Sequence, residues 1–372
     1  MAEGDAHMAA ALRVGLIGAG NISRAHVPAY RDYSDVVALT AVCDAHAPNA
    51  QRVAHEFGHS RIWEDYERFV VEAPVDAVDI CLPHHLHYPV AKAALEAGKH
   101  VLVEKPFAIT MRQCVELVEL AERCGRTLMV AQVQRYHATY HRLRTMIQSG
   151  ALGTIRHARI DALQNLHDYA EPPHWLYDGR QAGGGVVISV AVHKIDLLRY
   201  LVGDAVRVAA RGFTVDPAFI AAEDYCLATL ELENGALVDL FSTYAAAALP
   251  YSEMFWIFGD RGVVHTLPPA GQRTSAQPRI AFKQGTKSGR EFMELEPAPG
   301  VYPSASPFVN EILHFAACCT SGQEPLSSGR DNLKTMAVVF AIYESMRQDG
   351  RPVPVPAVLE AAGASPALLQ KR

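Results

Sequence analysis

A strand, a glycine turn and a helix follow one another near the start of the chain, and this pattern limits the fold most strongly. The apolar residues 12–17 lead into the glycine-rich residues 18–23, and helical spacing then continues to about residue 33. In dinucleotide folds the first glycine permits a tight turn, and the second lets the backbone approach a pyrophosphate at the helix N-terminus. Ser23 replaces the third glycine of that pattern with another small residue. The predicted cofactor contacts here are Gly18, Gly20, Asn21 and Ile22.

A second apolar stretch, residues 36–43, ends in Asp44. An acid about twenty residues beyond the glycines is placed to hydrogen-bond an adenosine ribose, and it would repel a 2′-phosphate. We therefore expect NAD as the cofactor and Asp44 as one of its contacts. His46 and Arg52 lie nearby in the sequence, so NADP stays open, and a helix or turn cap is the alternative interpretation of Asp44.

Strand-like and helix-like stretches keep alternating as far as residue 132. Strands are predicted at 77–82, 100–103 and 127–132, and helices at 48–57, 66–72, 88–97 and 110–124. Such alternation is typical of a parallel, doubly wound sheet. We predict an α/β protein whose residues 1–133 form an N-terminal Rossmann domain that binds a dinucleotide.

The pattern changes from residue 134. Residues 224–233 and 236–243 alternate like half-buried strands, and Asn234-Gly235 between them is a strong hairpin signal. Residues 134–372 are predicted to form a C-terminal α+β domain for substrate binding and oligomerisation, with a large, mostly antiparallel open sheet. We expect residues 268–307 to be loop with one irregular hairpin, followed by helices at 308–320 and 330–348.

Composition limits the partners of the chain. The 34 basic and 40 acidic residues give a net charge of −6, which argues against nucleic acid as a partner. No apolar run is long enough to span a bilayer, and the first residues do not resemble a signal peptide. The seven cysteines are scattered, so we expect no disulfide framework and a cytoplasmic location.

Lys105 follows a short buried strand that ends in Glu104, and Pro106 prevents the strand from continuing. Open α/β sheets bind ligands beyond the carboxyl ends of their strands, so Glu104 and Lys105 are predicted to face the cofactor. Residues 82–87 follow the preceding strand and include three histidines. No cysteine or carboxylate completes a zinc ligand set at a usual spacing, and we expect no metal. We expect instead a loop on the nicotinamide side of the cofactor, with contacts from Leu82, Pro83, His84 and His87. Capping of the next helix is the alternative role of His87.

Three glycines at 183–185 precede a helical stretch that contains Ser189 and His193. The glycines suit a loop that approaches another group closely. Ser189 and His193 are four residues apart and therefore share one side of a helix. A buried core histidine with satisfied hydrogen bonds is the alternative interpretation of His193.

These residues together resemble the glucose-fructose oxidoreductase and inositol dehydrogenase (Gfo/Idh/MocA) family. The matching segments span nearly the whole chain in order: residues 18–20, 94–101, 104–106, 147–153, 183–193 and 342–345. The resemblance implies an NAD(P)-dependent enzyme that acts on a sugar, a cyclitol or a related secondary alcohol. It also implies that Lys105 and His193 flank the substrate beside the nicotinamide ring. In the family an aspartate commonly stands four residues before that histidine, whereas this chain has Ser189. Family members tend to pair through the open face of the second sheet, so a homodimer or homotetramer is expected.

The expected reaction is hydride transfer from a carbinol carbon to the nicotinamide. His193 is the candidate base by its intrinsic pKa, and Lys105 would stabilise negative charge on the oxygen or act as the base itself. Two alternatives keep the fold: a redox-neutral enzyme that oxidises a sugar transiently with bound NAD, and a sugar- or nucleotide-sensing regulator without catalysis. The candidate substrate contacts are Lys105, Arg135, Tyr136, His167, Trp175, Ser189 and His193.

Overall fold

The computed structural model describes residues 10–59, 61–215, 217–246, 251–266, 278–282 and 292–369. A five-stranded parallel sheet, in the order β2-β1-β3-β4-β5, occupies the N-terminal part. Its strands are β1 (Leu12–Ile17), β2 (Val37–Cys43), β3 (Ala77–Ile80), β4 (His100–Glu104) and β5 (Leu128–Ala131). Its helices are α1 (Ser23–Asp32), α2 (Ala47–Glu56), α3 (Tyr66–Glu72), α4 (His84–Glu96) and α5 (Met111–Cys124). The predicted Rossmann architecture is confirmed.

The local sequence explains these elements. Every residue of β3 and β5 is buried, as expected for parallel strands covered on both faces. Helix α5 begins where the Thr110 side chain accepts a hydrogen bond from the amide of Gln113, and it ends at Gly125 in the left-handed conformation. The strand order reverses direction at β1, which has β2 on one side and β3 on the other. Ligand crevices of open α/β sheets form at such a point.

A nine-stranded sheet makes up most of the C-terminal part, in the order β13-β12-β11-β10-β6-β9-β8-β7-β14. Among the described strands of this second sheet, β6 and β9 are the one parallel pair. The strands are β6 (Ile155–Leu163), β7 (Ala205–Phe213), β8 (Tyr225–Leu232), β9 (Leu237–Thr243), β10 (Ser252–Gly259), β11 (Gly262–His265), β12 (Arg279–Phe282), β13 (Met293–Glu294) and β14 (Val353–Pro354). The predicted hairpin at Asn234-Gly235 joins β8 to β9, and Gly235 has a φ of 81°. The predicted mostly antiparallel sheet is therefore confirmed.

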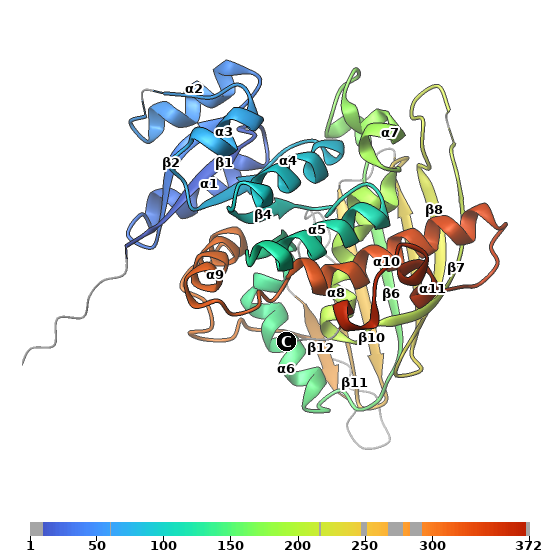
Figure 1. Cartoon of the computed structure of the whole chain (residues 1–372). Helices are drawn as coiled ribbons and strands as arrows, with labels where there is room; N and C mark the ends of the chain where they lie inside the picture. Colours follow the sequence, from blue (N-terminus) through green and yellow to red (C-terminus); the bar gives the residue numbers. More distant parts are fainter. Residues whose placement is uncertain are drawn as a thin grey trace, which may run out of the picture.

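Helices cover one face of this sheet and leave the other open (Figure 1). The long helix α10 packs on β7 and on α8, whereas α9 packs on α1 of the first sheet. Ile312 and Phe315 of α9 share a buried core with Leu16 of β1. The helices are α6 (Ala138–Gln148), α7 (Gly179–Ala182), α8 (Val192–Leu201), α9 (Pro307–Ser321), α10 (Gly329–Arg347) and α11 (Val355–Ala361). The short helical turns are η1 (Val133–Tyr136), η2 (Leu166–Asp168), η3 (Trp175–Tyr177), η4 (Val187–Ala191) and η5 (Pro366–Leu369). The domain boundary at residues 133 and 134 stays a prediction.

The structure differs from the sequence predictions in two places that concern the site. Helix α4 begins at His84, directly after Pro83, so the expected loop at residues 82–87 is mostly the first turn of a helix. The predicted helix after the triple glycine is not uniform, because the π-helical turn η4 precedes α8.

The expected irregular hairpin between residues 268 and 307 corresponds to β12 and β13, which pair in antiparallel fashion. Residues 267–277 and 283–291 of that stretch lie outside the described residues. Among the described helices, none combines the length and apolar character that crossing a membrane requires.

Candidate active site

A cavity of about 580 Å³ lies where the carboxyl ends of the parallel strands face the second sheet. This volume is within the range of small-molecule and cofactor sites. The first sheet and its helices contribute Ile22, Leu82, His84, Glu104 and Lys105 to the lining. The rest of the chain contributes Trp175, Ser189, His193, Tyr244, Tyr251 and Glu253, among others. The cavity thus joins the predicted nicotinamide side of the crevice to the predicted substrate side.

Lys105 lies at the end of β4 and reaches across this cavity. Its ammonium Nζ donates a hydrogen bond to the backbone carbonyl oxygen of Ser189 over 2.9 Å. Burial lowers the pKa of the ammonium group below its ordinary value, although the carboxylates of Glu104 and Glu253 oppose the shift. A lysine in this state still donates hydrogen bonds when it is charged. It also releases its proton more readily than a solvated lysine, because its pKa is lower.

His193 lies in the first turn of α8, directly after the π-helical turn. Burial, and then the nearby Lys105, lower the pKa of its ring to about 4. The imidazole is therefore neutral at neutral pH and has a lone pair for a proton. Its Nδ1 is buried and makes no hydrogen bond within the part of the chain that the structure describes. The sequence alternative, a core histidine with satisfied hydrogen bonds, does not describe this ring.

Glu223 and Tyr343 fix the backbone that carries His193. The Glu223 carboxylate accepts hydrogen bonds from the amides of Gly185 and Val187 and from the Tyr343 hydroxyl. The same hydroxyl accepts from the amide of Ile188. A Cβ on Gly185 would lie 1.7 Å from the carbonyl oxygen of Glu223, which explains why this position is glycine. These contacts place residues 183–193 beside residues 342–345, two of the segments that resemble the family.

The glycine turn leaves room for a pyrophosphate. Gly18 has a φ of 91°, and a Cβ there would lie 2.3 Å from the carbonyl oxygen of Cys81, so the turn packs tightly on the end of β3. A Cβ on Gly20 would meet nothing within 4 Å, so this glycine borders open space. Asp44 accepts hydrogen bonds from the amides of Ala19 (2.7 Å) and His46 (2.8 Å), which brings its carboxylate to the crevice. The turn and its acid fit a dinucleotide.

Behind Glu104 lies a buried polar cluster that the sequence analysis did not identify. His26 contacts Asp79 through Nδ1 (2.8 Å) and Glu104 through Nε2 (3.3 Å), and Tyr30 donates to Asp79. Burial opposes the charged ring, but Asp79 outweighs it and raises the pKa of His26 well above its ordinary value. Within the described residues, His26, Asp79 and Cys81 also form the one group with ligand atoms within 4.8 Å of one another. Their hydrogen bonds to each other account for this geometry without an ion.

The histidines of residues 84–87 make no such group. His84 lines the cavity, its Nδ1 contacts the carbonyl oxygen of Ala182, and its ring stands edge-on to Trp175. His87 is fully buried, and its two ring nitrogens face the carbonyl oxygens of Pro106 and Leu82. His87 is thus neither a helix cap nor part of the cavity lining, and its place is between α4 and the Lys105-Pro106 turn.

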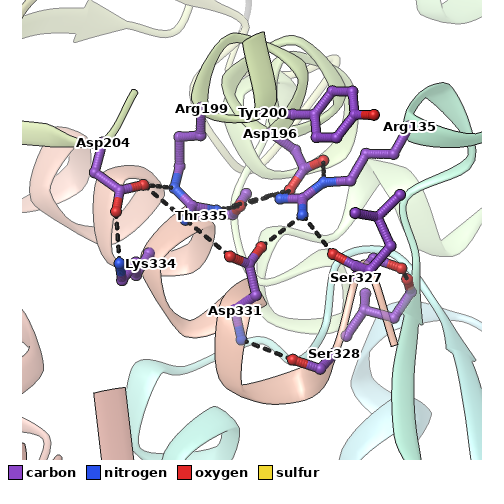
Figure 2. A network of polar contacts seen from close by, with 12 residues as sticks. Arg135, Asp196, Arg199, Tyr200, Asp204, Ser327, Ser328, Asp331, Lys334 and Thr335 are labelled. Carbon is purple, nitrogen blue, oxygen red and sulfur yellow. Dashed lines mark hydrogen bonds and ion pairs between the residues drawn. The ribbon is translucent and has the colours of Figure 1, made fainter. Parts of the chain in front are cut away.

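Arg135, predicted as a substrate contact, lies in an ion network outside the cavity lining (Figure 2). Its guanidinium pairs with Asp196 (2.6 Å) and Asp331 (2.7 Å), and it donates to the carbonyl oxygen of Leu326. Burial opposes the charge, but Asp196 and Asp331 raise the pKa of Arg135. The network continues from Asp331 and Asp196 through Arg199, Asp204, Lys334 and Thr335. It joins η1 to α8 and α10, so its evident role is to hold these elements together.

Two further predicted substrate contacts also lie away from the cavity lining. Tyr136 is fully buried and shares a hydrogen bond with Ser327. His167 is exposed and packs on Phe219 at 4.2 Å between ring centroids. Trp175 and Ser189 do line the cavity. The sequence analysis missed Glu253 and Tyr251, because nothing in their local pattern distinguishes them from other residues at a strand start.

Fold and site together define an oxidoreductase with a nicotinamide-dinucleotide crevice. Residues 12–132 match the family model described as "Oxidoreductase family, NAD-binding Rossmann fold", and residues 140–265 match that of the GFO/IDH/MocA C-terminal domain. The chain belongs to the GFO/IDH/MocA family of oxidoreductases. The family resemblance and the NAD-binding fold predicted from the sequence are confirmed.

Known relatives cover almost the whole chain. It is 30% identical over 347 residues to D-apiose dehydrogenase of Paraburkholderia graminis, which covers 91% of this chain and 88% of that protein. It is 28% identical over 339 residues to inositol 2-dehydrogenase 2 of Saccharopolyspora erythraea, which covers 90% and 93%. The solved structure of levoglucosan dehydrogenase with NADH and L-sorbose superposes with a TM-score of 0.82 at 26% identity, and covers 93% of this chain and 99% of that one.

Proposed function

We propose that this chain transfers a hydride between NAD and a secondary hydroxyl of a sugar, a sugar derivative or a cyclitol. The observation that carries the proposal is that Lys105 and His193, which are far apart in sequence, line one cavity with Ile22 and Leu82 of the dinucleotide crevice. The relatives named as apiose, inositol and levoglucosan dehydrogenases support this substrate class.

The protein groups divide the work around the reacting oxygen. As a secondary alcohol becomes a ketone, the carbon gives up a hydride, which bound NAD accepts, and the hydroxyl gives up a proton. The neutral imidazole of His193 takes that proton. Lys105 has three donor hydrogens and uses one on Ser189, so it can donate another to the oxygen and stabilise its developing charge.

A substrate screen tests the proposal. Sugars, inositols and glycosides are incubated with NAD and, separately, with NADP, and formation of the reduced cofactor is followed by absorbance. We expect turnover with at least one neutral polyol and a preference for NAD. Product formation without net reduced cofactor would favour the redox-neutral alternative instead. Cofactor binding with no turnover on any compound would favour the regulator.

We also propose that a second copy of the chain covers the open face of the large sheet. Leu237, His157 and Phe258 form one cross-strand row there, and the rings of His157 and Phe258 stack at 5.4 Å. Leu237 is 49% exposed and Phe258 is 36% exposed, and Leu227 on the neighbouring strand is 53% exposed. Exposed apolar side chains on one face of a sheet are typical of interaction sites. Light scattering after gel filtration should give a dimer or tetramer, and a monomer would contradict the proposal.

A further inference from the structure

Glu253 brings a carboxylate into the cavity from the large sheet, opposite the helix that lacks one at Ser189. It is the second residue of β10, pairs with Ala162 of β6, and lines the same cavity as Lys105 and His193. Its side chain is only 8% exposed. A carboxylate this deeply buried is costly unless hydrogen-bond partners compensate for the lost water.

Only one of its two oxygens is compensated. Oε2 accepts a hydrogen bond from Nε2 of Gln134 over 2.7 Å and lies 3.5 Å from Nζ of Lys194. Lys194 is held in turn by the other amide atom of Gln134, over 2.9 Å. Gln134 and Lys194 therefore fix the carboxylate by Oε2 alone.

The second oxygen, Oε1, is buried and makes no hydrogen bond with any of the described residues. The hydroxyl of Tyr251 lies near enough to lower the pKa of the carboxyl, yet it forms no hydrogen bond of ordinary geometry with Oε1. Burial would raise the pKa of Glu253, but Lys194 and His193 outweigh it and keep the group ionised. The site thus holds an anionic acceptor whose Oε2 is anchored and whose Oε1, beside the Tyr251 hydroxyl, can still accept a hydrogen bond.

The charges around the cavity indicate what kind of donor this acceptor takes. Among the described residues that line it, the carboxylates of Glu104, Asp168 and Glu253 face the ammonium of Lys105, and Lys194 outside the lining pairs with Glu253. Glu253 is also close enough to oppose the pKa shifts of both Lys105 and His193. A carboxylate or phosphate on the substrate would meet repulsion here, whereas a neutral hydroxyl would satisfy Oε1.

We propose that Oε1 of Glu253 accepts a hydrogen bond from a second hydroxyl of the substrate and selects neutral polyols over sugar acids and sugar phosphates. This rests on the proposed function. The helix that carries His193 has Ser189 on the side that faces the cavity, and Glu253 supplies a carboxylate there from β10.

The test compares wild type with Glu253→Gln. The amide can keep its oxygen toward Gln134 and Lys194, but it then presents a donor where Oε1 accepted. With a neutral sugar found in the screen, KM should rise about ten- to hundredfold, while the dissociation constant of NADH changes little. The melting temperature should fall, because the buried Lys194 loses its carboxylate partner. Calorimetry measures the dissociation constants of D-glucose and D-glucuronate from the NADH complex. The ratio by which the protein prefers D-glucose should be smaller in the variant than in the wild type.

Two further variants keep the test sharp. Glu253→Asp retains the charge but withdraws the carboxylate from the substrate, so it should also raise KM. It replaces the Gln variant in the test if that variant does not fold. Glu231→Gln on β8, an exposed glutamate paired with Arg207, is the matched control and should leave KM unchanged. If the wild type turns over a sugar and both Glu253 variants keep its KM and its selectivity, the proposed role of Glu253 is overturned but the proposed reaction is not. A wild-type protein without turnover would overturn the proposed reaction and this role with it.

Discussion

Nζ of Lys105 donates a hydrogen bond to the carbonyl oxygen of Ser189 over 2.9 Å, and this contact links the two sheets at the cavity. Lys105 follows β4 of the parallel sheet, and Ser189 lies in the π-helical turn that leads to His193. Such π-helical turns are rare and frequent at functional sites. The contact holds the ammonium group close to the imidazole while two of its three donor hydrogens remain for a ligand.

The two glycines of the turn should respond differently to alanine. Gly18→Ala should lower the melting temperature clearly, because its φ is positive and the new Cβ would meet the carbonyl of Cys81. Gly20→Ala should keep the wild-type melting temperature but weaken NADH binding, because the Cβ would enter the space left for the pyrophosphate. Thermal unfolding and fluorescence titration with NADH measure both effects. Unchanged NADH affinity in Gly20→Ala would contradict this placement of the cofactor.

Arg135→Met should destabilise the protein without altering substrate binding. Removal of the guanidinium breaks the buried pair with Asp196 and the pair with the partly buried Asp331. Both carboxylates are left with their longer contacts to Arg199, and the loss costs about 3–5 kcal/mol. Arg112→Met on α5 is the control, because Arg112 is 80% exposed and its pair with Glu116 is worth less than about 1 kcal/mol. Denaturant unfolding gives the difference, and KM is measured on the folded fraction. A raised KM with unchanged stability would return Arg135 to the substrate site.

Acidification should destabilise the protein between about pH 6.5 and pH 4. Burial lowers the pKa values of His84, His87 and His193 in the folded state, the last to about 4, whereas unfolded histidine titrates near 6.5. The unfolded chain therefore binds protons first as the pH falls, and stability that is complete above pH 6.5 is lost toward pH 4. Melting temperatures across this range measure the slope, and His84→Gln should make it shallower. A slope that does not change in this variant would contradict a neutral buried His84.

Asp44 should set the preference for NAD. In Asp44→Ala the ratio of kcat/KM for NAD to that for NADP should fall about tenfold or more, because the ribose loses a charged hydrogen-bond partner and a 2′-phosphate is no longer repelled. Steady-state kinetics with both cofactors check this. If the ratio stays the same, Asp44 is only the turn cap formed by its bonds to Ala19 and His46.

Features that depend on neighbouring residues could be predicted from the sequence. The glycine turn and the hairpin at Asn234-Gly235 are local, and the structure has both. Lys105 and His193 could be paired only through the family resemblance, because no local rule brings residues from different sheets together.

The remaining site features depend on contacts between distant segments. Arg135 meets Asp196 and Asp331, which lie 61 and 196 positions away, and nothing near Arg135 in sequence indicates a buried ion network rather than a ligand site. Glu253 likewise depends on Gln134, which is 119 positions away. Helix α4 begins at His84, four residues before the predicted start, and Pro89 lies inside its second turn, where a proline is normally disfavoured.

The central claim is that Lys105 and His193 act on one substrate oxygen, and removing each side chain tests it most directly. With a substrate from the screen, kcat of Lys105→Met and of His193→Asn should fall about 10²–10⁴-fold, while NADH binds with nearly wild-type affinity. Lys92→Met, which removes a half-exposed lysine on α4, is the matched control and should keep wild-type turnover. Near-normal turnover in both site variants would contradict the account.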